Sequence, residues 1–231
     1  MTNKRVFVGL SGGVDSSVAA LRLLRRGYDV VGVFIKVWQP DFIHCNWEQE
    51  RLDAMRVAAH LGIPFLTCDA ESSYKKGVAE YMIDAYQRGL TPNPDVMCNE
   101  EVKFGTFYTW AREHGADYIA TGHYAQHKVR EHQHTLHRAV DHAKDQTYFL
   151  ARIRQEALDH TLFPIGDTRK EVIRNEAHRA GLITHKKADS QGICFLGPVD
   201  IREFLSHYIE LTEGPVLDTR GNTIGRHHGA L

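Results

Sequence analysis

Residues 9–17 read GLSGGVDSS and follow the short apolar run Val6-Phe7-Val8. Glycines directly after a strand let the backbone approach an anion closely, and the N-terminus of the next helix adds partial positive charge. Serine hydroxyls offer further hydrogen bonds to phosphate oxygens. Here Gly12 and Gly13 allow the approach, and Ser11, Ser16 and Ser17 offer the hydroxyls. The predicted cofactor-binding residues of the stretch are Gly9, Leu10, Ser11, Gly12, Gly13, Val14, Asp15 and Ser16. The carboxylate of Asp15 suits a phosphate only if Mg²⁺ bridges the two groups.

The spacing of this glycine loop separates it from two common nucleotide motifs. No Gly-Lys-Ser/Thr closes the loop, as a Walker A motif requires, and no third glycine stands where the dinucleotide fingerprint has one. The alternative interpretation is a plain glycine turn in which an Asp or Ser caps the next helix. So many glycines and serines directly after a strand favour the phosphate loop.

The chain has four cysteines, Cys45, Cys68, Cys98 and Cys194. They are too scattered for a disulfide scaffold, and none forms the close pair of a zinc ribbon. Cys68 ends an apolar segment and Cys45 has no identifiable charged partner, so we interpret both as small buried hydrophobic residues. Cys98 and Cys194 follow the polar, turn-forming stretches PNPD and DSQG, which favours a chemical role. As thiolate or persulfide, such a cysteine carries a nucleophilic sulfur.

The pattern of apolar residues predicts the elements that position these groups. Short β-rich runs at Arg5–Leu10, Asp29–Trp38, 64–68 and 117–120 alternate with helical segments after the loop and at about 49–62, 73–88 and 101–114. This alternation predicts an α/β fold, a doubly wound and mostly parallel sheet. Ligands bind beyond the carboxyl ends of such strands, where the glycine loop and Thr121-Gly122-His123-Tyr124 both fall.

After residue 150 the strand pattern weakens. A helix is predicted over Thr168–Gly181 with Val172, Ile173 and Ala177 facing inward, a second helix over 199–209, and a hairpin around Arg220-Gly221-Asn222. Cations around the first of these helices form a candidate phosphate track: Arg169, Lys170, Arg174, Arg179, Lys186 and Lys187. We expect a catalytic domain over 1–188 and a partial second domain over 189–231.

The composition is that of an ordinary soluble globular chain. Of its 231 residues 42% are hydrophobic and 25% charged, and the formal net charge is −1. A nucleic-acid partner must therefore be bound by a local basic patch rather than by a global field. No apolar run is long enough to span a bilayer and no secretory leader is recognisable, so a cytoplasmic protein without a membrane partner is expected.

The stretch SGGVDSS resembles the PP-loop of ATP pyrophosphatases, enzymes of the adenine nucleotide alpha hydrolase-like class. Further stretches narrow the resemblance to the tRNA-specific 2-thiouridylases. They are TPNPDVMCN from Thr91, VKF from Val102, ATGHY from Ala120, KDQTYF from Lys144, FPIG from Phe163 and DSQGICF from Asp189. They follow the family's order and extend over nearly the whole chain.

The resemblance implies ATP-dependent thiolation at C2 of the wobble uridine of tRNA, with ATP and Mg²⁺ as cofactors. The C2 oxygen is adenylated, and a persulfide on Cys194, charged by a sulfur-relay protein, then attacks C2. Cys98 attacks that persulfide or resolves the product, which leaves a transient disulfide between the two cysteines. Asp95 is the implied general acid or base.

The resemblance also implies binding roles for residues outside the PP-loop. Asn93, Pro94 and Asp95 contact the target base, and the backbone of Ile35 meets adenine. Gly122 contacts the nucleotide, while His123 faces either ATP or tRNA. Lys144, Asp145 and Gln146 contact tRNA. For Asp95 the alternative is a helix N-cap, and for Ile35 it is a place in the apolar core.

The family pattern predicts a further β-barrel after GRHHGAL, and we expect this chain to lack it. Two alternative functions stay open. One is another PP-loop adenylating enzyme, which explains SGGVDSS but not the loops of Cys98 and Cys194. The other is a catalytically idle fragment that binds tRNA or ATP.

Overall fold

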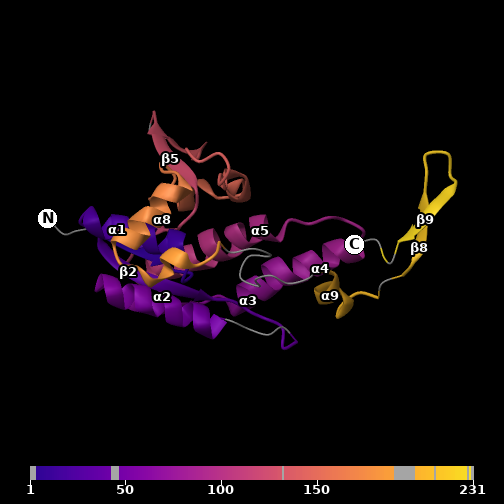
Figure 1. The fold of residues 1–231 in the computed structure, drawn as a ribbon, viewed down its shortest axis with the longest axis horizontal. Helices are drawn as coiled ribbons and strands as arrows, with labels where there is room; N and C mark the ends of the chain where they lie inside the picture. Colours follow the sequence, from indigo (N-terminus) through magenta and orange to yellow (C-terminus); the bar gives the residue numbers. More distant parts are fainter. Residues whose placement is uncertain are drawn as a thin grey trace.

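The computed structural model describes residues 4–42, 47–131, 133–189, 201–210, 212–227 and 229. Its centre is a parallel sheet of five strands in the order β3-β2-β1-β4-β7 (Figure 1). The strands are β1 (Arg5–Gly9), β2 (Asp29–Lys36), β3 (Phe65–Asp69), β4 (Tyr118–Ala120) and β7 (Thr161–Leu162). The strand order reverses at β1, so a ligand crevice is expected at the carboxyl end of that strand.

Helices cover both faces of the sheet, which confirms the predicted doubly wound α/β fold. Along β1 the side chains alternate, with Val6 and Val8 in one buried cluster and Phe7 in the other. One face is covered by α1 (Val14–Arg25), α2 (Trp47–Leu61) and α8 (Lys170–Arg179). The buried cluster on the other face includes residues of α3 (Glu71–Tyr74), η1 (Lys75–Glu80), α4 (Tyr81–Gln87), η2 (Cys98–Thr106), α6 (Phe107–Glu113) and α9 (Ile201–Ser206), and α5 (Pro94–Met97) packs against it through Met97.

The helix that carries Cys98 begins seven residues earlier than predicted, at Pro94 instead of Glu101. Proline suits the first turn of a helix because its missing N–H needs no acceptor there. The cap is Asn93, whose Oδ1 accepts a hydrogen bond from the N–H of Val96 at 3.0 Å. The prediction that Cys98 lies in a loop was therefore wrong, and so was the alternative that Asp95 is the cap.

Both long helices on this face contain a π-helical stretch, η1 and η2. In η2 a Cβ on Gly105 would lie 2.7 Å from the carbonyl oxygen of Glu100, five residues earlier. The hydroxyl of Thr106 donates to the carbonyl of Glu101 at 3.0 Å, which has the same spacing. Such widened turns occur frequently at functional sites, and this one begins at Cys98.

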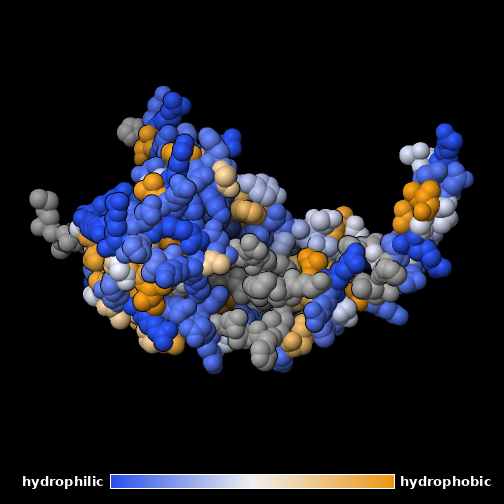
Figure 2. All heavy atoms as spheres, viewed as in Figure 1, coloured by the Kyte–Doolittle hydropathy of each residue, from blue (hydrophilic) through white to orange (hydrophobic). Residues whose placement is uncertain are grey.

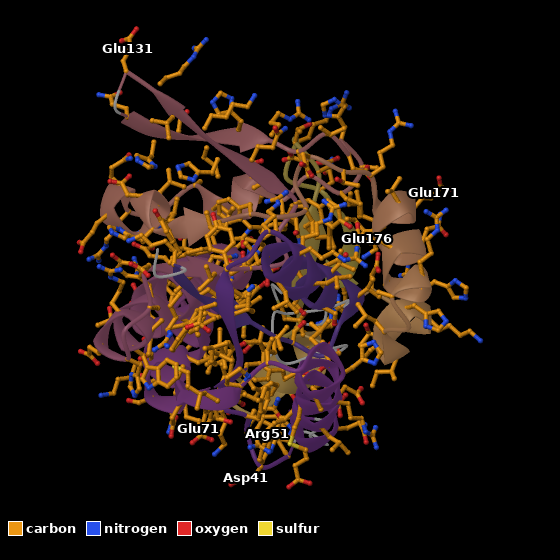
Figure 3. All side chains as sticks on the ribbon, turned by 90° about the vertical axis from the view of Figure 1, so that its left-hand side faces the viewer. Asp41, Arg51, Glu71, Glu131, Glu171 and Glu176 are labelled. Carbon is orange, nitrogen blue, oxygen red and sulfur yellow. The ribbon has the colours of Figure 1, made fainter. Side chains whose placement is uncertain are left out.

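Helix α8 is fastened to α1 by a half-buried ion pair. Arg22 donates to Oε2 of Glu176 through Nε at 3.0 Å and Nη2 at 2.8 Å. Figure 3 shows Glu176 turned toward α1, whereas Glu171 points away from the molecule. Ile173 and Ala177 are buried as predicted, but Val172 is 50% exposed. The prediction for Val172 was wrong. Successive side chains of an α-helix point about 100° apart around its axis, so Val172 points away from the face that buries its neighbour Ile173.

Two antiparallel hairpins lie outside the sheet. The sequence did not predict β5 (Ala125–Arg130) with β6 (Gln133–Arg138), whose tip is Glu131 with φ 47° (Figure 3). The predicted hairpin is confirmed as β8 (Gly214–Leu217) with β9 (Thr223–His227), and Gly221 supplies the positive φ of +85° in the turn. Figure 1 shows β8 and β9 at the end of the molecule beyond α4 and α9, and Figure 2 shows apolar side chains gathered on this hairpin.

The remaining short elements are η3 (Thr147–Leu150), α7 (Gln155–Asp159) and η4 (Ile183–Lys186). Among the described residues, no helix combines the length and apolarity needed to cross a membrane.

Candidate nucleotide and thiol site

The glycine loop connects β1 to α1 at the carboxyl end of the sheet. The N–H of Leu10 donates to the carbonyl of Val33 at 2.8 Å, and the chain then turns at Gly12, where φ is +70°. A Cβ on Gly12 would lie 2.6 Å from the carbonyl oxygen of Glu50, so both conformation and space require glycine. The first N–H groups of α1 have no acceptor within their own helix and point out of its N-terminus. The loop thus has the form of an anion site.

The serines of the loop fix its shape. The hydroxyl of Ser17 donates to the carbonyl of Gly13 at 2.6 Å, and Oγ of Ser16 accepts from the N–H of Ser11 at 3.2 Å. Leu10 and Val14 are buried, so their backbone groups alone face the loop. Ser11 is exposed at the loop surface and is thereby available to a ligand.

Two more residues that were predicted to bind the nucleotide lie against this loop. A Cβ on Gly122 would be 2.6 Å from the backbone nitrogen of Ser16, so the segment after β4 packs directly on the first turn of α1. Ile35 is buried in β2, with its Cδ1 3.6 Å from the position of a Cβ on Gly9. The structure therefore brings Gly9, Ile35 and Gly122 to one edge of the sheet.

The charge of Asp15 is balanced within the chain. Lys170 Nζ lies 2.7 Å from each carboxylate oxygen, and the Tyr124 hydroxyl donates to Oδ1 at 3.0 Å. Burial, followed by the charge of Asp15, raises the pKa of Tyr124, so its hydroxyl keeps its proton. The lysine side chain is only 11% exposed. Its predicted place in an outer phosphate track was wrong, because it faces inward to neutralise the loop.

Asp189 joins this network from the far side of Lys170. Its carboxylate oxygens form ion pairs with the side-chain nitrogens of Lys170 at 2.8 Å, Lys144 at 2.6 Å and Arg174 at 2.6 Å. Burial alone would raise the pKa of Asp189, but hydrogen bonds from Lys144 and Lys170 outweigh it and lower the pKa to about 2. Asp189 also begins the DSQG stretch that leads to Cys194. The network therefore connects the glycine loop to the start of that stretch.

Other members of the predicted phosphate track are also held by protein groups. Arg174 donates to the carbonyls of His185 and Lys187 at 3.2 and 2.9 Å. The ammonium of Lys187 pairs with Asp53 at 3.0 Å. These contacts also build the fold around the loop, and because both side chains stay about one third exposed, their place in the phosphate track stays a prediction.

Cys98 lies at the start of η2 and its side chain has no exposed surface. Asn93, Pro94 and Asp95 lie just before it and are half-buried. The side chain of Asn99 is nearly buried, and its amide donates to the carbonyl of Asp95 at 2.9 Å. Cys194 and Cys45 lie outside the described residues, so the predicted approach of Cys194 to Cys98 stays a prediction.

Cys68 has the environment predicted for it. It is fully buried in β3, and burial raises the pKa of its thiol to about 12. A thiol with that pKa is protonated at neutral pH and is a poor nucleophile. The interpretation of Cys68 as a small hydrophobic residue is confirmed.

His123 is buried behind the site. Burial, followed by the charge of Lys103, lowers the pKa of His123 well below its usual range, so the ring is neutral at pH 7. A neutral imidazole has one acceptor nitrogen. Nε2 takes that role toward the ammonium of Lys103 at 3.4 Å, and Nδ1–H donates to Thr121 Oγ1 at 2.8 Å. His123 thus orients the ammonium of Lys103.

Of the three residues predicted to contact tRNA, one lies at the surface and two have structural roles. Lys144 is 42% exposed and pairs with Asp189. Asp145 accepts hydrogen bonds from the N–H groups of Ala139 and Thr147 at 2.6 and 3.2 Å. Gln146 accepts from the N–H of Tyr124 at 3.0 Å. Asp145 and Gln146 therefore hold the loop that presents Lys144.

Several residues of the site were not identified from the sequence. Lys103, Tyr124, Tyr148 and Asp189 lie inside motif stretches already quoted, so their position beside predicted residues was the available signal. For Lys170, 155 positions from Asp15, the only signal was the need for a cation near a carboxylate in a phosphate loop.

The chain is similar in sequence to known proteins. Residues 4–198 match the family model described as tRNA methyl transferase HUP domain. The tRNA-specific 2-thiouridylase MnmA of Streptococcus pyogenes serotype M4 is 48% identical over 98% of this chain, and that of Streptococcus uberis is 47% identical over the same share. The chain spans 62% of the length of these relatives.

Solved structures share the fold at low sequence identity. A 4-thiouridine synthetase in complex with RNA and bound ATP has a TM-score of 0.52 at 21% identity, over 88% of this chain and 50% of that one. The U34-tRNA thiolase NcsA of Methanococcus maripaludis, with its 4Fe-4S cluster, has a TM-score of 0.51 at 16% identity, over 90% and 65%. These likenesses support the fold class.

Proposed function

Because the chain belongs to the tRNA methyl transferase HUP domain family, we propose that it replaces the C2 oxygen of the wobble uridine of tRNA with sulfur, using ATP. One observation carries the proposal: η2, which begins at Cys98, contacts the segment packed on the glycine loop, through Lys103 and His123. This contact supports a site that combines the phosphate loop with the thiol of Cys98. The 48% identity to 2-thiouridylases selects thiolation from among the reactions that such a site supports.

The residues of the loop fit the phosphates of ATP. Positive φ at Gly12 and the first turn of α1 supply a cradle of N–H groups, and Gly122 closes one side of it. When bound, ATP supplies the adenylyl group that makes the C2 oxygen a good leaving group. Asp15 is the carboxylate of the loop and would hold Mg²⁺ in place of part of its pairing with Lys170. Lys170 limits the negative charge there.

Two cysteines carry the sulfur in this proposal. A sulfur-relay protein charges Cys194 as a persulfide, and its terminal sulfur bonds to C2 as the activated oxygen leaves with AMP. The thiolate of Cys98 then bonds to Sγ of Cys194, and the sulfur–sulfur bond to the terminal atom breaks. Its electron pair stays with the sulfur on C2, which completes the 2-thiouridine. The Cys98–Cys194 disulfide that remains needs an external thiol reductant.

The N-terminus of α5, just before Cys98, is the proposed place for the uracil ring. Asn93, Pro94 and Asp95 are half-buried there, and Asp95 is the candidate acid or base for proton transfer at the ring. Lys144 would contact the tRNA backbone, because an exposed ammonium is a suitable partner for phosphate. Asp145 and Gln146 support that contact by holding its loop.

The test is a reaction of the chain with Mg-ATP, a protein persulfide donor and unmodified tRNA, followed by mass spectrometry of the nucleosides. We expect 2-thiouridine with the native chain and none with Cys194→Ser or Cys98→Ser. The matched control is Cys68→Ala, a cysteine of β3 with no role in the proposal, which should keep the product. Equal product from Cys98→Ser and the native chain would disprove the cysteine roles, and no product from the native chain would disprove thiolation by this chain.

A further inference from the structure

Tyr148 is the most exposed aromatic side chain among the described residues. It is 64% exposed, whereas Phe42, the next, is 41% exposed. Aromatic rings usually bury most of their surface, so an exposed ring that is also held in place indicates a contact surface. Tyr148 follows Lys144-Asp145-Gln146-Thr147 in the chain.

The ring of Tyr148 is held in position by the N-cap of α5, the helix that precedes Cys98. Its hydroxyl accepts a hydrogen bond from Nδ2 of Asn93 at 2.9 Å. The amide of Asn93 is itself fixed, because its Oδ1 caps α5 through the N–H of Val96. Asp95 and Cys98 follow Asn93 by two and five residues. Tyr148 is therefore tied to the element that carries the proposed base contact and the thiol.

The segment around Tyr148 is anchored on its other side as well. Asp145 accepts from both the N–H and the hydroxyl of Thr147, at 3.2 and 3.1 Å. The guanidinium of Arg152 forms an ion pair with Glu100 of η2. Contacts before and after the tyrosine thus restrain its backbone. Because the side chain is already ordered, the binding of a ligand over the ring would cost little conformational entropy.

We propose that Tyr148 is a stacking platform for an unpaired RNA base next to the target uridine. Proteins recognise single-stranded RNA loops by stacking bases on aromatic rings, and an exposed, restrained ring beside Asn93 meets that need. The exposed ammonium of Lys144, four residues earlier, suits the phosphate backbone of the same strand. This inference rests on the proposed function and makes Tyr148 a positioning residue, because its ring contacts a neighbouring base and no reacting atom.

The experiment uses the full 231-residue chain and a synthetic RNA hairpin of the anticodon stem and loop. Two hairpins carry the fluorescent base 2-aminopurine, one on each side of the target uridine. For Tyr148→Ala we expect hairpin affinity to fall about 5- to 150-fold, the range for loss of one stacked base. Fluorescence quenching of one of the two hairpins should also be lost. Tyr148→Phe keeps the ring and should bind within about 3-fold of the native chain.

Two further measurements separate stacking from a structural role. The control Leu24→Ala changes a side chain that is 36% exposed at the end of α1 opposite the glycine loop, and it should leave hairpin binding unchanged. ATP affinity and Tm of Tyr148→Ala should match those of the native chain, because the ring is mostly exposed. A fall in Tm together with weaker ATP binding would overturn the stacking role in favour of a structural one.

The outcomes also distinguish this inference from the proposed function. If the native chain forms 2-thiouridine but Tyr148→Ala binds the hairpin as tightly as the native chain, the stacking role is wrong and thiolation stands. Equal weakening by Tyr148→Phe and Tyr148→Ala would assign the effect to the hydroxyl and also overturn stacking. A native chain that binds no hairpin and forms no 2-thiouridine would overturn both.

Discussion

Replacement of Lys170 by methionine tests the charge balance of the glycine loop. The change keeps the length of the side chain but leaves Asp15 and Asp189 without a shared cation. Breaking a buried ion pair costs about 3 to 5 kcal/mol. Here both carboxylates are about 30% exposed and keep other donors, namely Tyr124 for Asp15, and Lys144 and Arg174 for Asp189. We therefore expect the free energy of unfolding to fall by about 2 kcal/mol.

The same change should weaken ATP binding. An uncompensated carboxylate in the loop repels the phosphates, and a loss of about 1.4 kcal/mol corresponds to a tenfold weaker Kd. Adding Asp15→Asn should restore part of the stability, with a coupling free energy of about 1 to 2 kcal/mol in the double-mutant cycle. Urea unfolding and calorimetric titration with ATP without Mg²⁺ measure the two effects.

The matched control is Lys4→Met, which removes the exposed ion pair to Asp117 at the amino end of the sheet, away from the glycine loop. Exposed pairs contribute little to stability, so this variant should be nearly as stable as the native chain and should bind ATP normally. The reasoning is refuted if Lys170→Met loses less than about 0.5 kcal/mol and binds ATP like the native chain, since the ion pairs of the loop would then have no energetic role.

Three further predictions test other parts of the site. The pKa of Asp189 is lowered to about 2, so its contribution to stability is present above its unfolded pKa of about 3.9 and is lost as pH falls toward 2. Between about pH 5 and pH 2 the free energy of unfolding of the native chain should fall by about 1 to 2 kcal/mol more than that of Asp189→Asn, as followed by circular dichroism in an acid titration. Parallel curves for the two proteins would contradict this. Gly122→Ala should lower Tm by several degrees, because its Cβ would lie 2.6 Å from the nitrogen of Ser16. At the control position Gly9 a Cβ would meet only ordinary contacts of 3.6 Å and longer. Equal Tm values for Gly122→Ala and Gly9→Ala would contradict the prediction and show that the loop moves to accommodate the methyl group. Lys144→Gln should reduce the slope of log K against log salt concentration for tRNA by about 0.7 to 0.9, the value of one phosphate contact, and an unchanged slope in filter binding would remove Lys144 from the interface.

Local patterns predicted the parts of the fold that local forces determine. The apolar run of β1, the glycines after it and the apolar stripe of α1 lie within 21 consecutive residues, so one sequence window predicted strand, loop and helix. The hairpin β5–β6 was missed because AQHKVR and QHTLHR contain few apolar residues and nearly all of its residues are half-buried or exposed. The helix start at Pro94 was missed because PNPD is also a typical turn sequence.

Long-range contacts determined the rest of the site. Asp15 and Lys170 are 155 residues apart, and no sequence window joins them. The same holds for Asn93 with Tyr148, which are 55 residues apart. The burial of Cys98 follows from its place in a helix packed on the sheet, which depends on the helix start. The motifs predicted which segments form the site, but the tertiary fold decided which of their side chains face the ligand.

The most direct test of the account follows the C2 oxygen itself. A tRNA whose target uridine carries a heavy oxygen isotope at C2 is turned over once by the chain with ATP and a persulfide donor, and the released AMP is analysed by mass spectrometry. If the glycine loop presents ATP for adenylation of this oxygen, the heavy isotope appears in the phosphate of AMP as 2-thiouridine forms. Heavy isotope found in water or in inorganic phosphate, with unlabelled AMP, would contradict the account.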